Sequence, residues 1–351
     1  MAALNAPVRP GRNLDYPFAG RPEPGTTIIV APGVHWVRMR LPFQLNHINL
    51  WLLEDGDGWT IIDTGIRDEP TAEMWKQLFV GPMQARPVKR VIVTHLHPDH
   101  VGMAGWLVRR FGVELWMSRT DYLLCRSLVA DTGQEAPREG VQFYRAAGLP
   151  NEALEAYRTR FGGFGRGVYA LPNSYRRMQD GDRITIGDRQ WQVVVGRGHA
   201  PEHVCLWSEP DGLFISGDQI LPRISSNVSV FPTEPEANPL QEWLDSCTLL
   251  RRLLPADVLV LPSHNEPFRG AHLRLEELIC EHESNLKKVA VLCDKPKRAV
   301  DCFEVLFRSR ITEGNTIMAT GESVAHLNCL RARGDLTRRF DDDGVAWYSR
   351  H

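Results

Sequence analysis

Three histidines and one aspartate fall within one seven-residue segment, Thr-His-Leu-His-Pro-Asp-His at 94–100. Imidazole and carboxylate groups are ligands that suit zinc and related divalent ions. His95 and His97 stand two residues apart, so in an extended segment both side chains point the same way. Asp99 and His100 belong to the following turn and can face a second ion. A lone His-x-His pair is common in surface loops, but four ligand-type residues in one run indicate a metal site.

Three later segments also place ligand-type side chains directly after a predicted buried strand. They are Gly-His-Ala-Pro-Glu-His at 198–203, Ser-Gly-Asp at 216–218 and Leu-Pro-Ser-His at 261–264. In open α/β folds sites form where the carboxyl ends of strands converge. We therefore expect His199, Asp218 and His264 to join the first run. Two ions need about six to seven protein ligands once a position is left open for water, and these residues supply that number.

The sequence resembles the metallo-β-lactamase superfamily over residues 26–265. The residues that carry the resemblance are Asp63 in Ile-Asp-Thr-Gly, the run of His95, His97, Asp99 and His100, and then His199, Asp218 and His264. The resemblance implies a four-layer αββα sandwich with a binuclear metal site at one edge. It implies that the first ion is bound by His95, His97 and His199, and the second by Asp99, His100 and His264. It further implies that Asp218 bridges the ions and that Asp63 orients the ligand loop without binding metal. We assign catalytic roles to Asp63 and Asp99.

A binuclear centre of this kind implies hydrolysis. We expect two Zn²⁺ per chain, with Fe or Mn as alternatives, and a metal-bound hydroxide that attacks a carbonyl or phosphoryl centre. The Gly-x-Ser-x-Gly signature of a serine hydrolase is absent. The predicted function is a metal-dependent hydrolase acting on a small-molecule ester or thioester. The alternatives are an endoribonuclease or phosphodiesterase of the same superfamily, a lactonase or promiscuous β-lactamase, and a metal-bearing interaction scaffold.

The composition argues against several other functions. The chain has 351 residues, of which 43% are hydrophobic and 24% charged, as in a typical globular protein. A net charge of −2 argues against a protein that binds nucleic acid mainly through a surplus of positive charge. The sequence has no apolar run of about 18 residues, so we expect no membrane span. The N-terminus lacks the apolar core of a signal peptide. We therefore expect a cytoplasmic protein. Seven cysteines without a Cys-x-x-Cys pair predict no disulfide framework.

Changes of pattern divide the chain into three parts. Residues 1–25 are rich in Pro, Gly and Arg and predict an N-terminal arm. Residues 26–267 alternate short strands with helices, which predicts an α/β domain. Within this domain, a helical insertion at about 118–177 is expected to form a lid over the metals. Residues 268–351 follow the order helix, helix, helix, hairpin, which predicts a small winged-helix-like domain.

The predicted winged-helix-like domain has no surplus of positive charge. Residues 266–351 contain 14 Lys plus Arg and 14 Asp plus Glu. A protein that reads duplex nucleic acid needs cations to neutralise phosphates. The balance therefore favours a packing role, or a contact within a homodimer, over nucleic-acid binding.

The predicted lid interleaves aromatic residues with arginines, including Arg176 and Arg177. Such a mixture suits a substrate with an apolar part and an anionic part. An ordinary pair of amphipathic helices with solvated arginines would show the same pattern. Phe43, Gln44 and His47 lie in a loop between two predicted strands, and in this superfamily that loop often borders the substrate groove. We take these five residues as candidate substrate-binding residues.

Overall fold

The computed structural model describes residues 11, 13–43, 45–308 and 310–350. It contains a seven-stranded sheet in which the strands follow sequence order, antiparallel from β1 to β4 and parallel from β4 to β7. These strands are β1 (Ile28–Ala31), β2 (Val34–Arg40), β3 (His47–Asp55), β4 (Gly58–Ile62), β5 (Val88–Ile92), β6 (Glu114–Met117) and β7 (Arg176–Arg177).

A second sheet has five strands in the order β12-β11-β10-β9-β8. Only β11 and β12 pair in parallel, and the other pairs are antiparallel. Its strands are β8 (Arg183–Ile186), β9 (Arg189–Gly196), β10 (His203–Ser208), β11 (Leu213–Gly217) and β12 (Leu259–Pro262).

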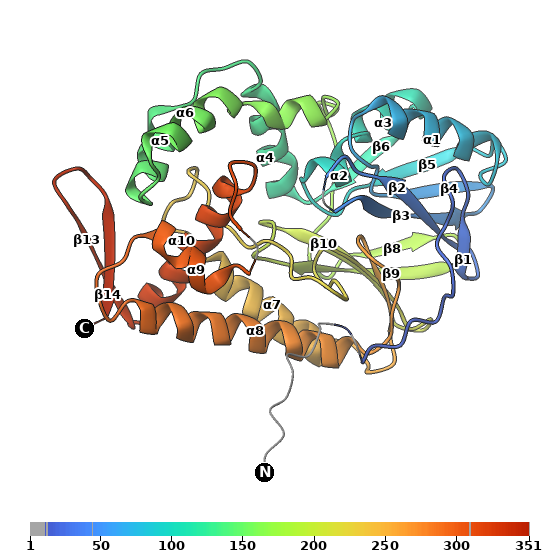
Figure 1. Cartoon of the computed structure of the whole chain (residues 1–351). Helices are drawn as coiled ribbons and strands as arrows, with labels where there is room; N and C mark the ends of the chain where they lie inside the picture. Colours follow the sequence, from blue (N-terminus) through green and yellow to red (C-terminus); the bar gives the residue numbers. More distant parts are fainter. Residues whose placement is uncertain (1–10, 12, 44, 309, 351) are drawn as a thin grey trace, which may run out of the picture.

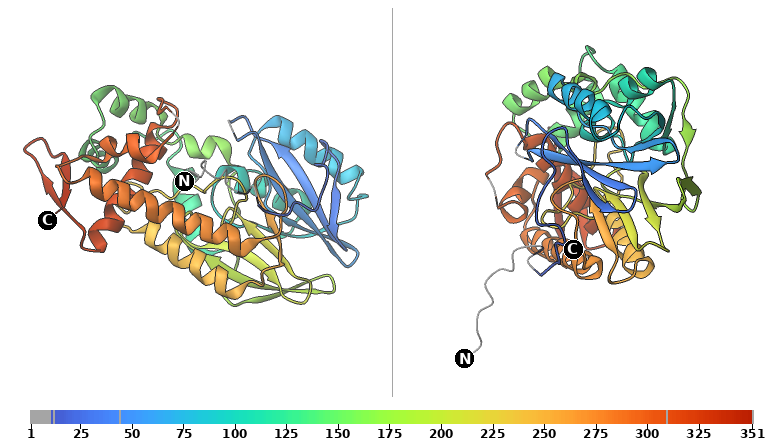
Figure 2. Two further views of the ribbon diagram at one scale, coloured as in Figure 1. Left: turned by 60° about the horizontal axis from the view of Figure 1, so that its bottom comes forward. Right: turned by 90° about the vertical axis from the view of Figure 1, so that its right-hand side faces the viewer.

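The two sheets face each other, and helices cover both outer faces (Figures 1 and 2). An apolar layer that includes Trp36, Trp51 and Trp191 fills the space between the sheets. Helices α1 (Glu69–Val80) and α3 (Ala104–Phe111) cover the seven-stranded sheet, and α7 (Pro239–Leu253) and α8 (Ala271–Leu292) cover the other. The predicted four-layer αββα sandwich is confirmed.

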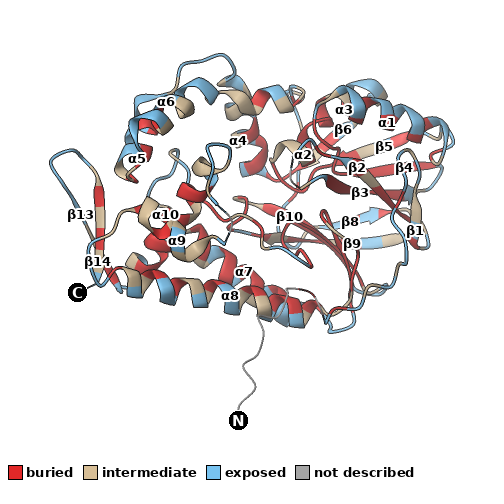
Figure 3. Cartoon of the chain, viewed as in Figure 1, coloured by how far each residue is buried: buried red, intermediate tan, exposed pale blue. Residues whose placement is uncertain are grey.

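Burial follows from this layering (Figure 3). The first seven residues of β3 are all buried, because this strand lies inside one sheet and both of its faces are covered. A tight turn joins β3 to β4, and Gly56 adopts φ +63° there, a left-handed conformation that glycine accepts without steric cost. The hairpin sets the register of β4 and so fixes where Asp63, which follows it, is placed.

Four strand ends supply the candidate ligands or their supports at one edge of the sandwich. The strands are β4, β5, β11 and β12, which pair in parallel within each sheet. The residues that follow them are Asp63, the run 94–100, Asp218 and His264. Carboxyl ends of parallel strands lie at the same edge of a sheet. The fold therefore gathers residues separated by up to 201 positions in the sequence, from Asp63 to His264.

The predicted lid region contains three helices and a 3₁₀ turn. They are α4 (Arg119–Ala130), α5 (Arg138–Ala146), α6 (Asn151–Arg160) and η1 (Gly163–Gly167). In Figure 1 this green segment lies above the loops and helix α10 on the left of the molecule. The segment then returns to the seven-stranded sheet as β7, which pairs in parallel with β6.

The C-terminal part continues from the long helix α8 into short helices and a hairpin. The elements are η2 (Ala299–Cys302), α9 (Phe303–Leu306), α10 (Thr316–Ala332), β13 (Leu336–Phe340) and β14 (Ala346–Arg350). Their buried residues share one apolar cluster with the sandwich, in which Ala325 of α10 and Trp243 of α7 both take part. Leu14 of the predicted N-terminal arm belongs to the same cluster. The division into domains and the winged-helix likeness stay predictions.

No helix among the residues described is both long and apolar enough to cross a membrane.

Candidate metal centre

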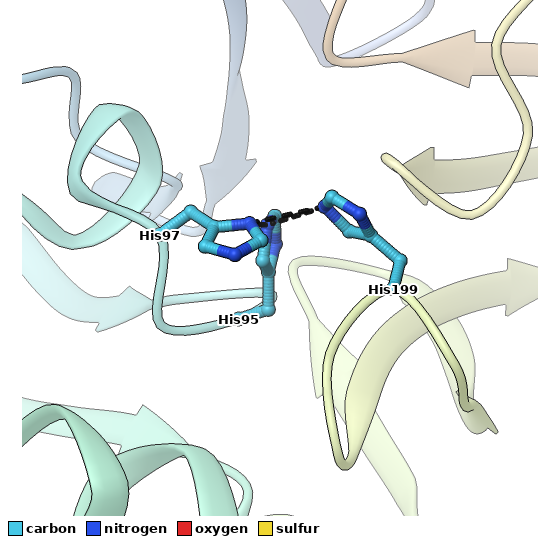
Figure 4. Close-up of side chains that lie close together, drawn as sticks. All are labelled: His95, His97 and His199. Atoms are coloured by element: carbon cyan, nitrogen blue, oxygen red, sulfur yellow. Dashed lines mark hydrogen bonds between the residues drawn. The ribbon is translucent and has the colours of Figure 1, made fainter. Parts of the chain in front are cut away.

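Three imidazoles converge at the edge where β5 ends (Figure 4). His95 and His97 come from the loop between β5 and α2 (Pro98–Val101), and His199 comes from the loop between β9 and β10. His97 Nδ1 lies 2.8 Å from His95 Nε2 and 3.0 Å from His199 Nε2, and the two Nε2 atoms are 3.3 Å apart. Nitrogens bound at zinc distances in tetrahedral geometry lie about 3.3 Å from one another. The three nitrogens are therefore spaced as the ligands of one ion would be.

Burial keeps the imidazoles of His95 and His97 in the form that can bind metal. It lowers the pKa of His97 to about 3, with the neighbouring His199 acting in the same direction. It also holds the pKa of His95 well below its ordinary value. A neutral imidazole keeps a free lone pair on one nitrogen, which is the form that coordinates a cation.

Asp99, His100 and His264 form a second cluster beside the first. His264 Nε2 lies 3.5 Å from Asp99 Oδ2, and His100 Nε2 lies 3.7 Å from the same oxygen. Burial alone would lower the pKa of His264, but the carboxylates of Asp218 and Asp99 raise it to about 10. The second cluster thus favours a positive charge, which a divalent ion supplies as well as a proton does.

Asp218 stands between the two clusters. Its Oδ2 lies 3.4 Å from His199 Nε2, on the side of the first cluster. Its Oδ1 lies 3.4 Å from His264 Nε2 and 3.5 Å from His100 Nε2, on the side of the second. One carboxylate oxygen directed toward each cluster is the arrangement that a bridging ligand needs.

Two buried atoms at this point, His100 Nε2 and Asp218 Oδ1, have no hydrogen-bond partner within the part of the chain that the structure describes. Buried polar atoms are almost always paired in folded proteins. A cation bound between these two atoms would satisfy both. The donor set, with three groups of ligand atoms each within 4.8 Å of one another, therefore fits a binuclear metal centre.

Asp63 supports the centre from behind the ligand loop. Its Oδ1 accepts a hydrogen bond from the Thr94 backbone N–H at 2.8 Å, and its Oδ2 accepts one from His100 Nδ1 at 2.8 Å. The Thr94 hydroxyl donates to the same Oδ2 at 2.9 Å. Asp63 is only 1% exposed and adopts φ +60°, so its backbone is held in a left-handed conformation to make these contacts. The carboxylate orients the imidazole of His100 and leaves its Nε2 directed at the centre.

Backbone carbonyls orient two further imidazoles in the same way. His199 Nδ1 donates to the Asn227 carbonyl at 2.7 Å, and His264 Nδ1 donates to the His47 carbonyl at 2.8 Å. With the proton on Nδ1, the Nε2 lone pair of each ring faces the centre. The sequence singles out His47 as a substrate-binding candidate, but the structure places it against His264, which it contacts through its carbonyl and through the edge-to-face packing of its ring.

A side chain from the C-terminal part of the chain contacts Asn227, the residue whose carbonyl orients His199. Asn227 Nδ2 donates to Glu322 Oε2 at 2.8 Å, and Glu322 lies on α10. Burial raises the pKa of Glu322 to about 7, and its like-charged neighbour Glu281 acts in the same direction. Helix α10 is thereby linked to His199 through Asn227. No motif in the sequence predicts this connection.

His203 and Gly217 position the central aspartate. His203 is fully buried, and its Nε2 accepts a hydrogen bond from the Asp218 backbone N–H at 3.0 Å. A Cβ at Gly217 would lie 2.4 Å from His203 Cε1, so only glycine leaves room for this ring. His203 follows His199 by four residues in the same strand-end segment, and this placement is the sequence signal for its supporting role.

Asp121 holds the ligand loop from the lid side. It is fully buried at the start of α4, and its two carboxylate oxygens accept hydrogen bonds from the backbone N–H groups of Leu96 and Glu202. Leu96 lies between His95 and His97, so this contact fixes the loop that presents them. Burial raises the pKa of Asp121 to about 6.

A cavity of about 730 Å³ opens beside the first cluster, with His97 and His199 in its wall. Aromatic residues of the lid helices line another part of it, among them Tyr144, Tyr157 and Phe161. The volume is typical of a site for a small molecule. The lid region thus contributes walls to a cavity that reaches the candidate metal centre.

The candidate substrate-binding residues that the structure describes do not line this cavity. Phe43 is 57% exposed, Arg176 and Arg177 are exposed on β7, and none of the three lines this cavity. Gln44 lies outside the residues that the structure describes. His47 is 7% exposed and does not line the cavity. Their assignment to substrate binding stays a prediction.

The other arginines of the lid region do not supply a positive cavity wall either. Arg158 pairs with Glu155, and Arg160 pairs with Glu313, all on exposed surface. These two side chains therefore correspond to the solvated arginines of ordinary amphipathic helices. Aromatic residues of the predicted lid line the cavity, whereas Arg158 and Arg160 do not.

The sequence model described as the metallo-beta-lactamase superfamily matches residues 44–264 of this chain. The chain belongs to this superfamily. A second model, described as the metallo-beta-lactamase-like C-terminal domain, matches residues 286–351. The family predicted from the run of histidines and aspartates is therefore confirmed.

Known relatives agree with this assignment. A crystal structure of a beta-lactamase domain protein from Burkholderia ambifaria is 44% identical, covers 96% of this chain and 98% of its own, and superposes with a TM-score of 0.89. The probable metallo-hydrolase YqjP of Bacillus subtilis (strain 168) is 25% identical, over 88% of this chain and 95% of its own. The human acyl-coenzyme A thioesterase MBLAC2 is 25% identical, over 69% of this chain and 81% of its own. The chain is a metal-dependent hydrolase of the superfamily.

Proposed function

We propose that the protein hydrolyses an ester or thioester and that it does so with two bound zinc ions. The first ion would be held by His95, His97 and His199. The second would be held by Asp99, His100 and His264, with Asp218 shared between the two. The observation that carries this proposal is the placement of Asp218, whose two carboxylate oxygens face different clusters.

Two such ions, when bound, supply an activated water and polarise the oxygen of the scissile group. The residues of the chain have the task of holding them in place. Asp63 holds the ring of His100, and the Asn227 carbonyl holds the ring of His199. Asp99 stays ionised, because His100 and His264 overcome the effect of burial and lower its pKa to about 2. This anion would help to hold the second ion.

The choice of an ester or thioester rests on the cavity and on one relative. The cavity beside His97 and His199 has the size for a small-molecule substrate. The relative MBLAC2 is named as an acyl-coenzyme A thioesterase. A polynucleotide substrate would need a basic track for its phosphates, whereas the chain has a net charge of −2.

A panel of substrates tests the proposal. Zinc-loaded protein should hydrolyse p-nitrophenyl acetate and an acyl-coenzyme A thioester, and a chelator should abolish both activities. The panel also contains a lactone, a β-lactam, a phosphodiester and single-stranded RNA. Cleavage of RNA or the phosphodiester, with every ester and thioester left intact, would overturn the proposal in favour of a nuclease.

A further inference from the structure

The cavity beside the candidate metal centre has an unusual balance of charge. Its wall contains five carboxylates and one arginine, namely Asp131, Glu135, Glu202, Glu234, Glu242 and Arg197. No lysine lines it. Among the described residues, Asp131, Glu135 and Glu234 make no ion pair within 4.0 Å. The negative charge of this wall is therefore largely uncompensated.

Apolar and aromatic side chains form another part of the wall. Leu124 and Leu128 of α4 face it, together with Tyr144 of α5 and Tyr157 of α6. The two tyrosine rings lie 4.6 Å apart and form a continuous aromatic surface. Apolar surface of this kind gains from burying hydrocarbon.

The position of the cavity indicates that it can hold only one of the two parts of a substrate bound at the centre. It touches His97 and His199 of the first cluster, whereas Asp99, His100 and His264 of the second do not line it. A substrate carbonyl at the metal centre can therefore direct one of its two substituents into this space. A thiol or alcohol carrier that bears phosphates or carboxylates would be repelled there.

We propose that this cavity binds the acyl chain of the substrate and selects chains whose far end carries no negative charge. The inference rests on the proposed function and names its substrate class, esters and thioesters of uncharged acyl chains. The acyl chain lies between the tyrosines and the leucines of α4. The carrier would lie outside this cavity.

Three p-nitrophenyl esters test both parts of this proposal on the zinc-loaded protein. They are the acetate, the octanoate, and the monoester of octanedioic acid, which ends in a carboxylate. Burying a methylene is worth about a threefold to fourfold gain in affinity, so kcat/KM for the octanoate should exceed that for the acetate by at least about 100-fold. The octanedioate monoester should fall below the octanoate by about tenfold or more.

Two pairs of variants locate the effect in the cavity. Leu124→Trp should fill the space and lower the ratio of octanoate to acetate kcat/KM by at least about tenfold. Leu123→Trp is the matched control, because Leu123 is the neighbouring residue on α4, is 55% exposed and does not line the cavity. Asp131→Asn combined with Glu135→Gln should narrow the difference in kcat/KM between the octanoate and the octanedioate monoester. Glu152→Gln, on the exposed surface of α6, should leave this difference unchanged.

The outcomes separate this inference from the proposed function. Metal-dependent hydrolysis of the acetate without any gain for the octanoate would overturn the acyl-chain assignment and leave the hydrolase proposal intact. Equal kcat/KM values for the octanoate and the octanedioate monoester would overturn the proposal that the cavity selects acyl chains by charge. Failure to hydrolyse any ester or thioester, in protein that contains two zinc ions, would overturn the proposed function itself.

Discussion

The Asp63 carboxylate accepts a hydrogen bond from His100 Nδ1 at 2.8 Å, and both side chains are almost completely buried. This contact fixes the ring of His100 so that Nε2 faces the second cluster. An aspartate far from the run 94–100 is thereby placed behind a candidate ligand, where it can orient the ring.

Removal of this contact should loosen the second metal position. Asp63→Ala should lower metal affinity or turnover by about 10–100-fold, the usual effect of losing a partner behind a ligand. Asp63→Asn should retain more activity than the alanine variant, because the amide oxygen can still accept one of the hydrogen bonds. Metal content by elemental analysis and kcat for the best ester are the measurements. A variant with unchanged metal content and unchanged kcat would show that Asp63 stabilises only the turn in which it lies.

Substitution of the central and peripheral ligands should have different effects on metal content. Wild-type protein purified without chelator should approach two ions per chain. Asp218→Ala should weaken both positions and abolish hydrolysis, because each of its oxygens faces one cluster. His264→Ala should lose chiefly the second ion and approach one per chain. Two ions and full turnover in His264→Ala would contradict its assignment.

Gly217 should tolerate no side chain. An alanine Cβ there would approach the His203 ring to 2.4 Å, in a backbone conformation with φ +51° that disfavours alanine. Gly217→Ala should therefore cost about 1–3 kcal/mol of stability and displace Asp218, with loss of bound metal. Urea unfolding and elemental analysis test this prediction. Gly212→Ala is a useful control, since Gly212 also has positive φ but a Cβ added there would meet no described atom within 4 Å.

Glu322 should make stability depend on pH. Its folded pKa of about 7 lies above the ordinary value of 4.5, because burial disfavours the charged form. The stabilisation that comes from binding this proton is complete below about pH 4.5 and is lost as the pH rises to 7. Glu322→Gln mimics the neutral form and keeps an oxygen for Asn227, so it should be more stable than wild type by about 1–3 kcal/mol at pH 8 and similar at pH 4.5.

Urea unfolding of the zinc-loaded protein at several pH values measures this difference. Glu304→Gln is the control, because Glu304 is exposed and should show no pH-dependent gain. A difference between Glu322→Gln and wild type that stays constant from pH 5 to pH 8 would contradict the assigned cause.

Residue types and their spacing were enough to predict the family and the candidate ligands. The run 94–100 is contiguous, so its four ligand-type residues must lie near one another in any fold. His199, Asp218 and His264 follow apolar strands, and strand ends of this kind converge in α/β folds. The alternation of strands and helices over 26–267 was sufficient to predict an α/β domain, and the resemblance to the superfamily implied the layered sandwich.

The supports of these ligands, and the surfaces beside them, depend on how the chain folds. Contacts such as Asn227 with Glu322, or His203 with Asp218, join residues whose spacing carries no periodic signal. The charge of the cavity is also a tertiary property, since its wall combines Asp131 of the lid region with Glu234 of a distant loop. The sequence shows the arginines of the lid region, but the folding of each helix decides which face meets the cavity. That face is aromatic, because apolar rings gain from burial while guanidinium groups remain better solvated at the surface.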